Sequence, residues 1–281
     1  MTAGLLDVCV LIRGGGEMAS GVAHRLHQCR MNVLITEITA PTAVRRTVAY
    51  AEAIYRGCHT IENVKSVRAS TVREAHELWD EGMIPIFIDP SAAIRHEVNP
   101  GVIVDAIMAK RGSSTTILDA PLVIGIGPGF IAGENVHAIV ESNRGYRLGR
   151  VIWHGTAEPD TGVPAPVAGY TETRVLRAPR SGLFKGVRDI GDVVQQGEIV
   201  ANVESIPICA EISGIVRGML HDGVQVEAGV KVGDVDPRGE REYCDAISDK
   251  ARAIGGGVVE AILHSCQRLK HPAHGTGQRL N

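Results

Sequence analysis

A glycine-rich loop between an apolar segment and an amphipathic segment is the feature that most constrains this chain. Residues 5–12 are short, apolar and rich in β-branched side chains, which is typical of a buried strand, and Arg13, Gly14, Gly15 and Gly16 follow directly. Residues 18–29 carry apolar side chains at helical spacing, and residues 32–37 form a second apolar run. This order predicts a β–α–β unit, which joins two parallel strands through a helix.

The loop also fits a known phosphate-binding pattern. Gly14, Gly16 and Ala19 match the G-x-G-x-x-[GA] spacing, and Glu37 follows about 20 residues later, where an acid that binds a ribose hydroxyl is expected. Gly14 would allow a tight turn, Gly16 would let a phosphate approach the backbone, and Ala19 would let the helix pack closely. We therefore expect a nucleotide or similar anion at the helix N-terminus. The alternative interpretation is a glycine-rich turn that binds nothing.

A second glycine-rich loop follows the apolar segment 122–126. Its Gly125, Gly127 and Gly129 could let backbone amides form an anion-binding concavity, although a tight turn without a ligand is the alternative. The basic residues proposed as anion partners are Arg13, Arg45 and Arg252.

The chain predicts an α/β fold in three parts. Residues 1–148 alternate strand-like and helix-like segments, with helices expected over 42–55 and 72–79, which predicts a Rossmann-like, mostly parallel sheet that binds a nucleotide or cofactor. Residues 149–239 contain a connector and an all-β module with regularly spaced glycines. Residues 240–281 contain a helix, expected over 247–263, and a frayed tail, and we expect the helix to pack back onto the sheet.

Residues 190–230 carry two G-x-x-V-x-x-G units around a central strand. This stretch resembles the barrel-sandwich fold of biotinyl and lipoyl carrier domains. The segment 204–210, where those carriers present a modifiable lysine, contains no lysine, so we expect no lipoyl or biotin attachment. Three successive glycines at 255–257 would each cost a helix about 1 kcal/mol relative to alanine, which predicts close approach to another backbone or to a ligand.

Composition narrows the functional classes. The net charge of −3 and the absence of a basic run argue against nucleic-acid binding. The six cysteines show no C-x-x-C pair and suit a reducing, cytoplasmic environment. No secretory signal pattern and no uncharged apolar stretch of membrane-spanning length occur, so we expect no membrane association. Motifs for metal binding or for nucleophilic catalysis are also missing, and no catalytic residue or metal ligand is assigned.

Several stretches together resemble one family: 12–26, 36–48, 122–130, 174–179 and 248–257. They are similar to the YqeB family, accessory proteins of selenium-dependent molybdenum hydroxylases, and more distantly to XdhC-type maturation factors. The resemblance implies a maturation factor that binds or modifies a molybdopterin dinucleotide, or a similar nucleotide, before insertion into the hydroxylase. It implies the hydroxylase and its maturation machinery as partners, and a homo-oligomer is a further expectation.

Two alternative functions remain open at this stage. One is an NAD-dependent oxidoreductase, for which Glu37 would favour NAD over NADP, although no acid–base residue stands out. The other is a scaffold that docks partner proteins through the β module and uses the Rossmann unit structurally.

Overall fold

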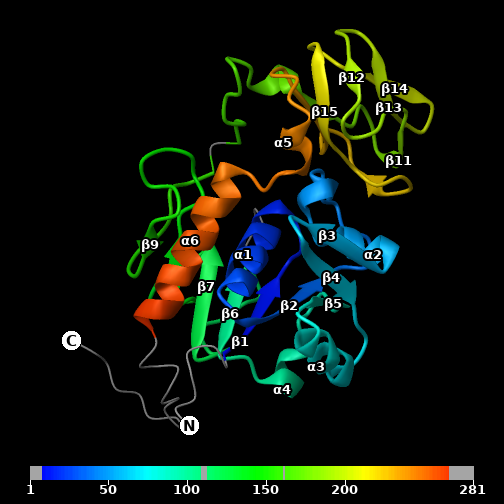
Figure 1. The fold of residues 1–281 in the computed structure, drawn as a ribbon. Helices are drawn as coiled ribbons and strands as arrows, with labels where there is room; N and C mark the ends of the chain where they lie inside the picture. Colours follow the sequence, from blue (N-terminus) through cyan, green and yellow to red (C-terminus); the bar gives the residue numbers. More distant parts are fainter. Residues whose placement is uncertain (1–7, 109–112, 161, 266–281) are drawn as a thin grey trace.

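The computed structural model describes residues 8–108, 113–160 and 162–265. The chain begins with a large mixed sheet of nine strands, in the order β3-β4-β5-β2-β1-β6-β7-β8-β9 (Figure 1). The strands are β1 Cys9–Arg13, β2 Asn32–Glu37, β3 Cys58–Ile61, β4 Val64–Arg68, β5 Ile84–Ile88, β6 Val102–Asp105, β7 Leu122–Ile126, β8 Ala138–Val140 and β9 Val151–Ile152.

The centre of this sheet is apolar on both faces. Strands β1, β2, β6 and β7 are almost continuous buried runs, as expected for parallel strands covered on two sides. The described residues form six α-helices: α1 Glu17–Gln28, α2 Glu52–Arg56, α3 Val72–Asp80, α4 Arg95–Val98, α5 Glu242–Asp245 and α6 Asp249–His264. The predicted β–α–β unit is present as β1, α1 and β2, with β1 paired parallel to β2.

Helix α6 packs beside α1 at very short range (Figure 1). A Cβ atom built on Gly21 would lie 2.6 Å from the Cβ atom of Ala251, and one built on Gly255 would lie 3.1 Å from the carbonyl oxygen of Gly21. A Cβ on Gly257 would lie 2.2 Å from the carbonyl oxygen of Gly149. The glycines at 255 and 257 therefore permit backbone contact, which is the first of the two roles expected for them.

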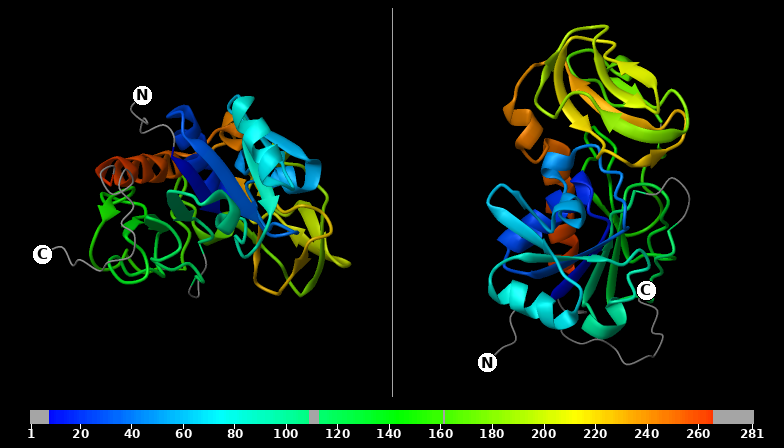
Figure 2. Two further views of the ribbon diagram at one scale, coloured as in Figure 1. Left: turned by 90° about the horizontal axis from the view of Figure 1, so that it is seen from below. Right: turned by 90° about the vertical axis from the view of Figure 1, so that its right-hand side faces the viewer.

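A smaller β module lies beyond one end of the large sheet (Figure 2). It consists of two four-stranded antiparallel sheets, in the orders β10-β17-β15-β12 and β14-β13-β11-β16. Its strands are β10 Val175–Arg177, β11 Gly182–Gly186, β12 Val193–Val194, β13 Ile199–Val203, β14 Ile206–Cys209, β15 Gly214–Met219, β16 Gln225–Val226 and β17 Lys231–Asp236.

The predicted fold class, a Rossmann-like sheet with a barrel-sandwich module, is wrong. The large sheet is mixed, because β3 pairs antiparallel with β4 and β8 pairs antiparallel with β9. No helix appears in the described residues between β6 and β7 or between β7 and β8, so these steps are not β–α–β crossovers. The C-terminal α6 instead contacts this part of the sheet. The β module consists of two antiparallel sheets, and the chain as a whole is a mixed α/β protein.

The predicted helix over 42–55 is also wrong. Only a 3₁₀ turn at Arg46–Val48 and the short α2 are helical there. The backbone of Val44 instead accepts a hydrogen bond from Met219 N of β15 at 2.8 Å. Tertiary pairing with the β module thus overrides the helical pattern in this segment.

The division at residues 148 and 239 stays a prediction, and the predicted frayed tail lies outside the described residues beyond 265. In the described part of the chain, no helix is both long and apolar enough to span a membrane.

Candidate functional site

Two adjoining cavities open at the end of the large sheet that faces the β module. The smaller, here called the edge crevice, has a volume of about 340 Å³ and is lined by Gly14, Gly16 and Glu37 among others. The larger, here called the arginine cavity, has a volume of about 920 Å³ and lies between the loops after β7 and β8 and the strands β15 and β17. Glu17, Met18 and Met108 line both cavities, so the two share a wall.

The edge crevice lies at the carboxyl ends of β1, β2 and β6, where successive strands are added on opposite sides of β1. Strand β1 pairs with β2 on one side and with β6 on the other, and both pairings are parallel. The crevice outside the carboxyl ends of such strands is where open α/β sheets bind ligands. The structure thus places Gly14, Gly16 and Glu37 of the predicted pattern in one crevice at this end of the sheet, and their binding of a ligand stays a prediction.

The N-terminus of α1 opens into this crevice. Gly16 is the N-cap residue, and no side chain caps the helix. A Cβ on Gly16 would meet no atom within 4 Å, so the space in front of the first turn is free. Gly14, with φ at +93°, makes the tight turn, and a Cβ there would lie 3.2 Å from the carbonyl oxygen of Ala106. Uncapped N–H groups and the positive end of the helix dipole favour an anion at this point.

Glu37 lies at the end of β2 and folds back onto the glycine loop. Its carboxylate accepts hydrogen bonds from Gly15 N and from Ile38 N, each at 2.7 Å. Burial raises the pKa of Glu37, while the two backbone N–H groups oppose the rise. Each carboxylate oxygen retains capacity for one more hydrogen bond, so Glu37 can fix the loop and still accept from a hydroxyl group in the crevice.

Two further residues of the glycine loop and α1, Gly15 and Ala19, have packing roles. A Cβ on Gly15 would lie 3.0 Å from Ala51 N, and Ala19 is completely buried against the core. Both positions require small residues for close packing of the loop and helix, and neither contributes to the lining of the two cavities.

The second glycine loop is less open than the sequence suggests. A Cβ on Gly125 would lie 2.4 Å from the Phe130 ring, and Gly127 donates its N–H to the Val140 carbonyl at 2.9 Å. Of the three predicted residues only Gly129, with φ at +103°, lines a cavity, and it lines the arginine cavity. The loop is thus largely a structural turn.

The three predicted arginines have different environments. Arg13 is buried and ion-paired with Asp105 at 3.6 Å, and it donates to Ser114 Oγ at 3.1 Å. Arg252 lies on α6 and forms two hydrogen bonds to Glu62, at 2.6 and 2.8 Å, away from both cavities. Arg45 lines the arginine cavity, and it donates to Tyr243 O at 2.9 Å and to Glu17 Oε1 at 3.3 Å. Arg13 lines the edge crevice and Arg45 lines the arginine cavity, and the Nε atom of each is buried without a hydrogen-bond partner.

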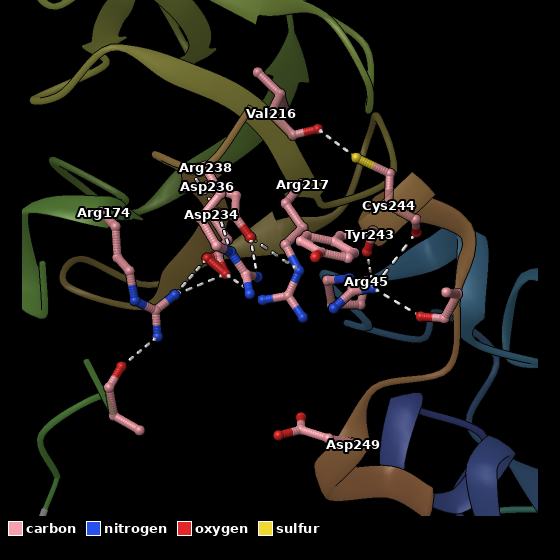
Figure 3. A network of polar contacts seen from close by, with 12 residues as sticks. Arg45, Arg174, Val216, Arg217, Asp234, Asp236, Arg238, Tyr243, Cys244 and Asp249 are labelled. Atoms are coloured by element: carbon pink, nitrogen blue, oxygen red, sulfur yellow. Dashed lines mark hydrogen bonds and ion pairs between the residues drawn. The ribbon is translucent and has the colours of Figure 1, made fainter. Parts of the chain in front are cut away.

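The sequence-based interpretation missed most of the arginine cavity. Its cationic lining residues come from six separate segments of the chain: Arg45, Arg144, Arg174, Arg217, Lys231 and Lys250. Figure 3 shows Arg174 and Arg217 of the β module and Arg45 of the large sheet converging on one region. The signals available in the sequence were the resemblance over 36–48, 174–179 and 248–257, which contain Arg45, Arg174 and Lys250, because no short-range spacing links the lining positions.

No group of three or more metal-ligating side chains occurs in the part of the chain that the structure describes. The thiol of Cys244 is buried, and burial raises its pKa, which disfavours a reactive thiolate.

No protein-family model matches the chain. The chain is 45% identical over 254 residues to "Uncharacterized protein YqeB" of Escherichia coli (strain K12). The aligned region covers 90% of this chain and 47% of that protein. The chain therefore spans about half the length of the curated relative it matches.

Similar solved structures include an aspartoacylase family protein from Mesorhizobium loti (13% identity, TM-score 0.27) and a succinylglutamate desuccinylase/aspartoacylase from Rhodobacter sphaeroides (15% identity, TM-score 0.25). Each match covers 82% of this chain and 85% of the other chain.

These solved structures are described as aspartoacylase and succinylglutamate desuccinylase proteins, and the curated relative is described as uncharacterized. The expected role in the maturation of a selenium-dependent molybdenum hydroxylase, as an XdhC-like factor, is not retained. The predicted cofactor and partners stay predictions. By sequence, the chain is similar to YqeB over 90% of its own residues, which supports the resemblance to the YqeB family.

Proposed function

We propose that this chain binds a small, nucleotide-like molecule in the edge crevice, with a phosphate group at the N-terminus of α1. The observation that supports this most directly is the free space at Gly16, in front of an uncapped helix of 12 residues. Three N–H groups in the first turn of a helix have no acceptor within the helix, and a phosphate oxygen accepts from them well.

Glu37 would contribute the second contact. Its carboxylate accepts a hydrogen bond from Gly15 N of the glycine loop, and Glu37 lines the crevice. A ribose hydroxyl donates a hydrogen bond to such a carboxylate, so a nucleoside phosphate satisfies both ends of the crevice. The side chains of Ile38, Ile107 and Met108 contribute an apolar part of the wall, against which a base can pack.

The test is a calorimetric titration of ADP and NAD into the protein and into two glycine variants. Gly16→Val places a side chain in the free space without a clash inside the protein, so we expect the fold to persist and binding to be lost. Gly256→Val is the matched control, because a Cβ there also meets no atom within 4 Å, but on the exposed side of α6. Equal affinity of Gly16→Val and the unsubstituted protein, or no binding to the unsubstituted protein, would contradict the proposal.

A further inference from the structure

The arginine cavity contains a cationic cluster that the edge crevice does not use. It is built from the network in Figure 3 together with Glu17 and Lys231. The cations that line the cavity are Arg45, Arg174, Arg217 and Lys231, and the carboxylates with which they pair there are Glu17 and Asp234. Asp236 and Arg238 belong to the same ion-pair network but do not line the cavity. Four positive groups thus share two negative groups of the lining.

Arg217 is the least satisfied member of this cluster. Its side chain is only 14% exposed, and its ion pairs are long, at 3.8 Å to Asp234 and 3.7 Å to Asp236. Within the described residues it forms no hydrogen bond, and its Nε atom is buried without a partner. A guanidinium group has five donors in a rigid fork, so a buried one without acceptors is costly unless a ligand supplies them.

Two neighbouring arginines also keep unused donors. Arg45 and Arg174 are 6% and 8% exposed, and the Nε atom of each is buried without a hydrogen-bond partner. Arg174 Nη1 donates hydrogen bonds to both carboxylate oxygens of Asp234, at 2.7 and 2.9 Å. The negative charge of Asp234 is therefore shared between Arg174 and Arg217. The positive charge of the cluster is therefore only partly compensated by the protein.

Further cations at the rim strengthen this imbalance. Lys250 lies in the first turn of α6, and burial together with Arg144 lowers its pKa. Two further carboxylates, Glu158 and Asp160, also line the cavity. The lining as a whole contains six cationic side chains and four carboxylates, so the field inside the cavity favours an anion.

From this arrangement we propose that the arginine cavity is a second ligand site, which binds a small organic molecule carrying two or more negative oxyanion charges through Arg217. Guanidinium forks bind carboxylates and phosphates bidentately, and either oxyanion fits this donor set. The volume of about 920 Å³ is that of a substrate site rather than a single-ion site. The site is separate from the nucleotide proposal, because none of the cluster residues except Glu17 and Arg45 belongs to the elements that form the crevice.

The experiment titrates pyrophosphate and, separately, succinate into the full chain and into Arg217→Gln. We expect millimolar or tighter binding of at least one probe to the unsubstituted protein and at least tenfold weaker binding to the variant. Tighter binding of pyrophosphate would identify phosphates as the ligand class, and tighter binding of succinate would identify carboxylates. Arg188→Gln is the matched control, because Arg188 pairs with Glu198 on the same β module but does not line the cavity.

Thermal unfolding separates a binding defect from a folding defect. Arg217 forms no hydrogen bonds in the described protein, so Arg217→Gln should unfold at the same or a higher temperature, and only the unsubstituted protein should be stabilised by the anion. Arg217→Lys keeps the charge but loses the fork, and we expect intermediate affinity. The proposal would be overturned if neither probe binds the unsubstituted protein, or if Arg217→Gln binds the probes with equal affinity. Titration of ADP into Arg217→Gln tests the edge crevice independently.

Discussion

At the residue scale, Glu37 shows what a sequence pattern can and cannot predict. Its position after the second strand predicted an acid at the carboxyl edge, and the structure places it there. Its hydrogen bonds to Gly15 N and Ile38 N were not predictable, because they depend on the path of the loop in three dimensions. Arg13 and Arg252 were assigned as anion partners from charge alone, yet each already has a carboxylate partner.

Glu37 gives a pH prediction for the proposed nucleotide. Only the ionised carboxylate can accept from a ribose hydroxyl and both backbone N–H groups. Because burial raises the pKa of Glu37, its protonation begins at a higher pH than for an exposed glutamate. ADP affinity should therefore fall as the pH is lowered toward that pKa, and Glu37→Gln should leave only the weaker dependence that protonation of the ADP phosphate itself causes at about pH 6. Titrations between about pH 7 and pH 4.5 check it; an identical pH profile in the variant would contradict it.

Asp249 gives a second prediction at this scale. Arg144 donates to both of its carboxylate oxygens, at 2.7 and 2.8 Å, and lowers the pKa of Asp249 to about 2. A lowered pKa in the folded state stabilises the protein above the unfolded-state pKa, and this stabilisation is lost as the pH falls toward 2. Because the side chain is largely exposed, Asp249→Asn should cost only about 0.5–1 kcal/mol near pH 7.

Urea unfolding at two pH values checks the Asp249 prediction. The difference in the free energy of unfolding between Asp249→Asn and the unsubstituted protein should become smaller toward about pH 3, because the carboxylate becomes protonated in the unfolded chain. A difference that stays constant or widens at low pH would show that the ion pair is not its cause.

At the element scale, local patterns predicted α1 and its flanking strands, because each has its own periodicity. The hairpin of β3 and β4, in whose turn Glu62 and Asn63 take positive φ, was not assigned from the sequence. The helix expected over 42–55 was wrong, because the backbone of Val44 pairs with Met219, 175 positions further along the chain. Such long-range pairing leaves no periodic signal in either segment.

The glycines of α6 give a prediction at this scale. Gly257→Ala should lower the free energy of unfolding by about 1–3 kcal/mol, because its Cβ would overlap the carbonyl oxygen of Gly149. Gly256→Ala should raise it by up to about 1 kcal/mol, because that position has free space and alanine favours a helix. Urea unfolding of both variants measures the contrast; similar effects of the two substitutions would show that the close contact of α6 is not needed.

At the scale of the whole molecule, the contact between the large sheet and the β module builds the candidate sites. The segment around Arg45 and Arg46 is its centre: Arg46 Nε donates to Met219 O at 2.8 Å, and Arg45 donates to Tyr243 O at 2.9 Å. The arginine cavity could not be predicted from the sequence, because its residues are brought together only when these two parts of the chain meet.

This contact predicts cooperative unfolding. The unsubstituted protein should unfold in one calorimetric transition, and Arg45→Ala, which leaves Glu17 and the Tyr243 carbonyl without their donor, should cost about 1–3 kcal/mol and broaden or split that transition. Arg73→Ala is the control, because Arg73 is 84% exposed and its ion pair with Glu77 contributes little. A sharp single transition in Arg45→Ala, at an unchanged temperature, would contradict the prediction.

Hydrogen–deuterium exchange with and without ADP tests the central claim, a phosphate at the N-terminus of α1, most directly. We predict that ADP slows exchange of the amides in residues 14–20 and 36–43, which border the edge crevice, and leaves the outer strands of the β module unchanged. The Gly16→Val variant should lose this protection. Protection confined to other segments, or no protection at ADP concentrations that saturate binding, would contradict the account.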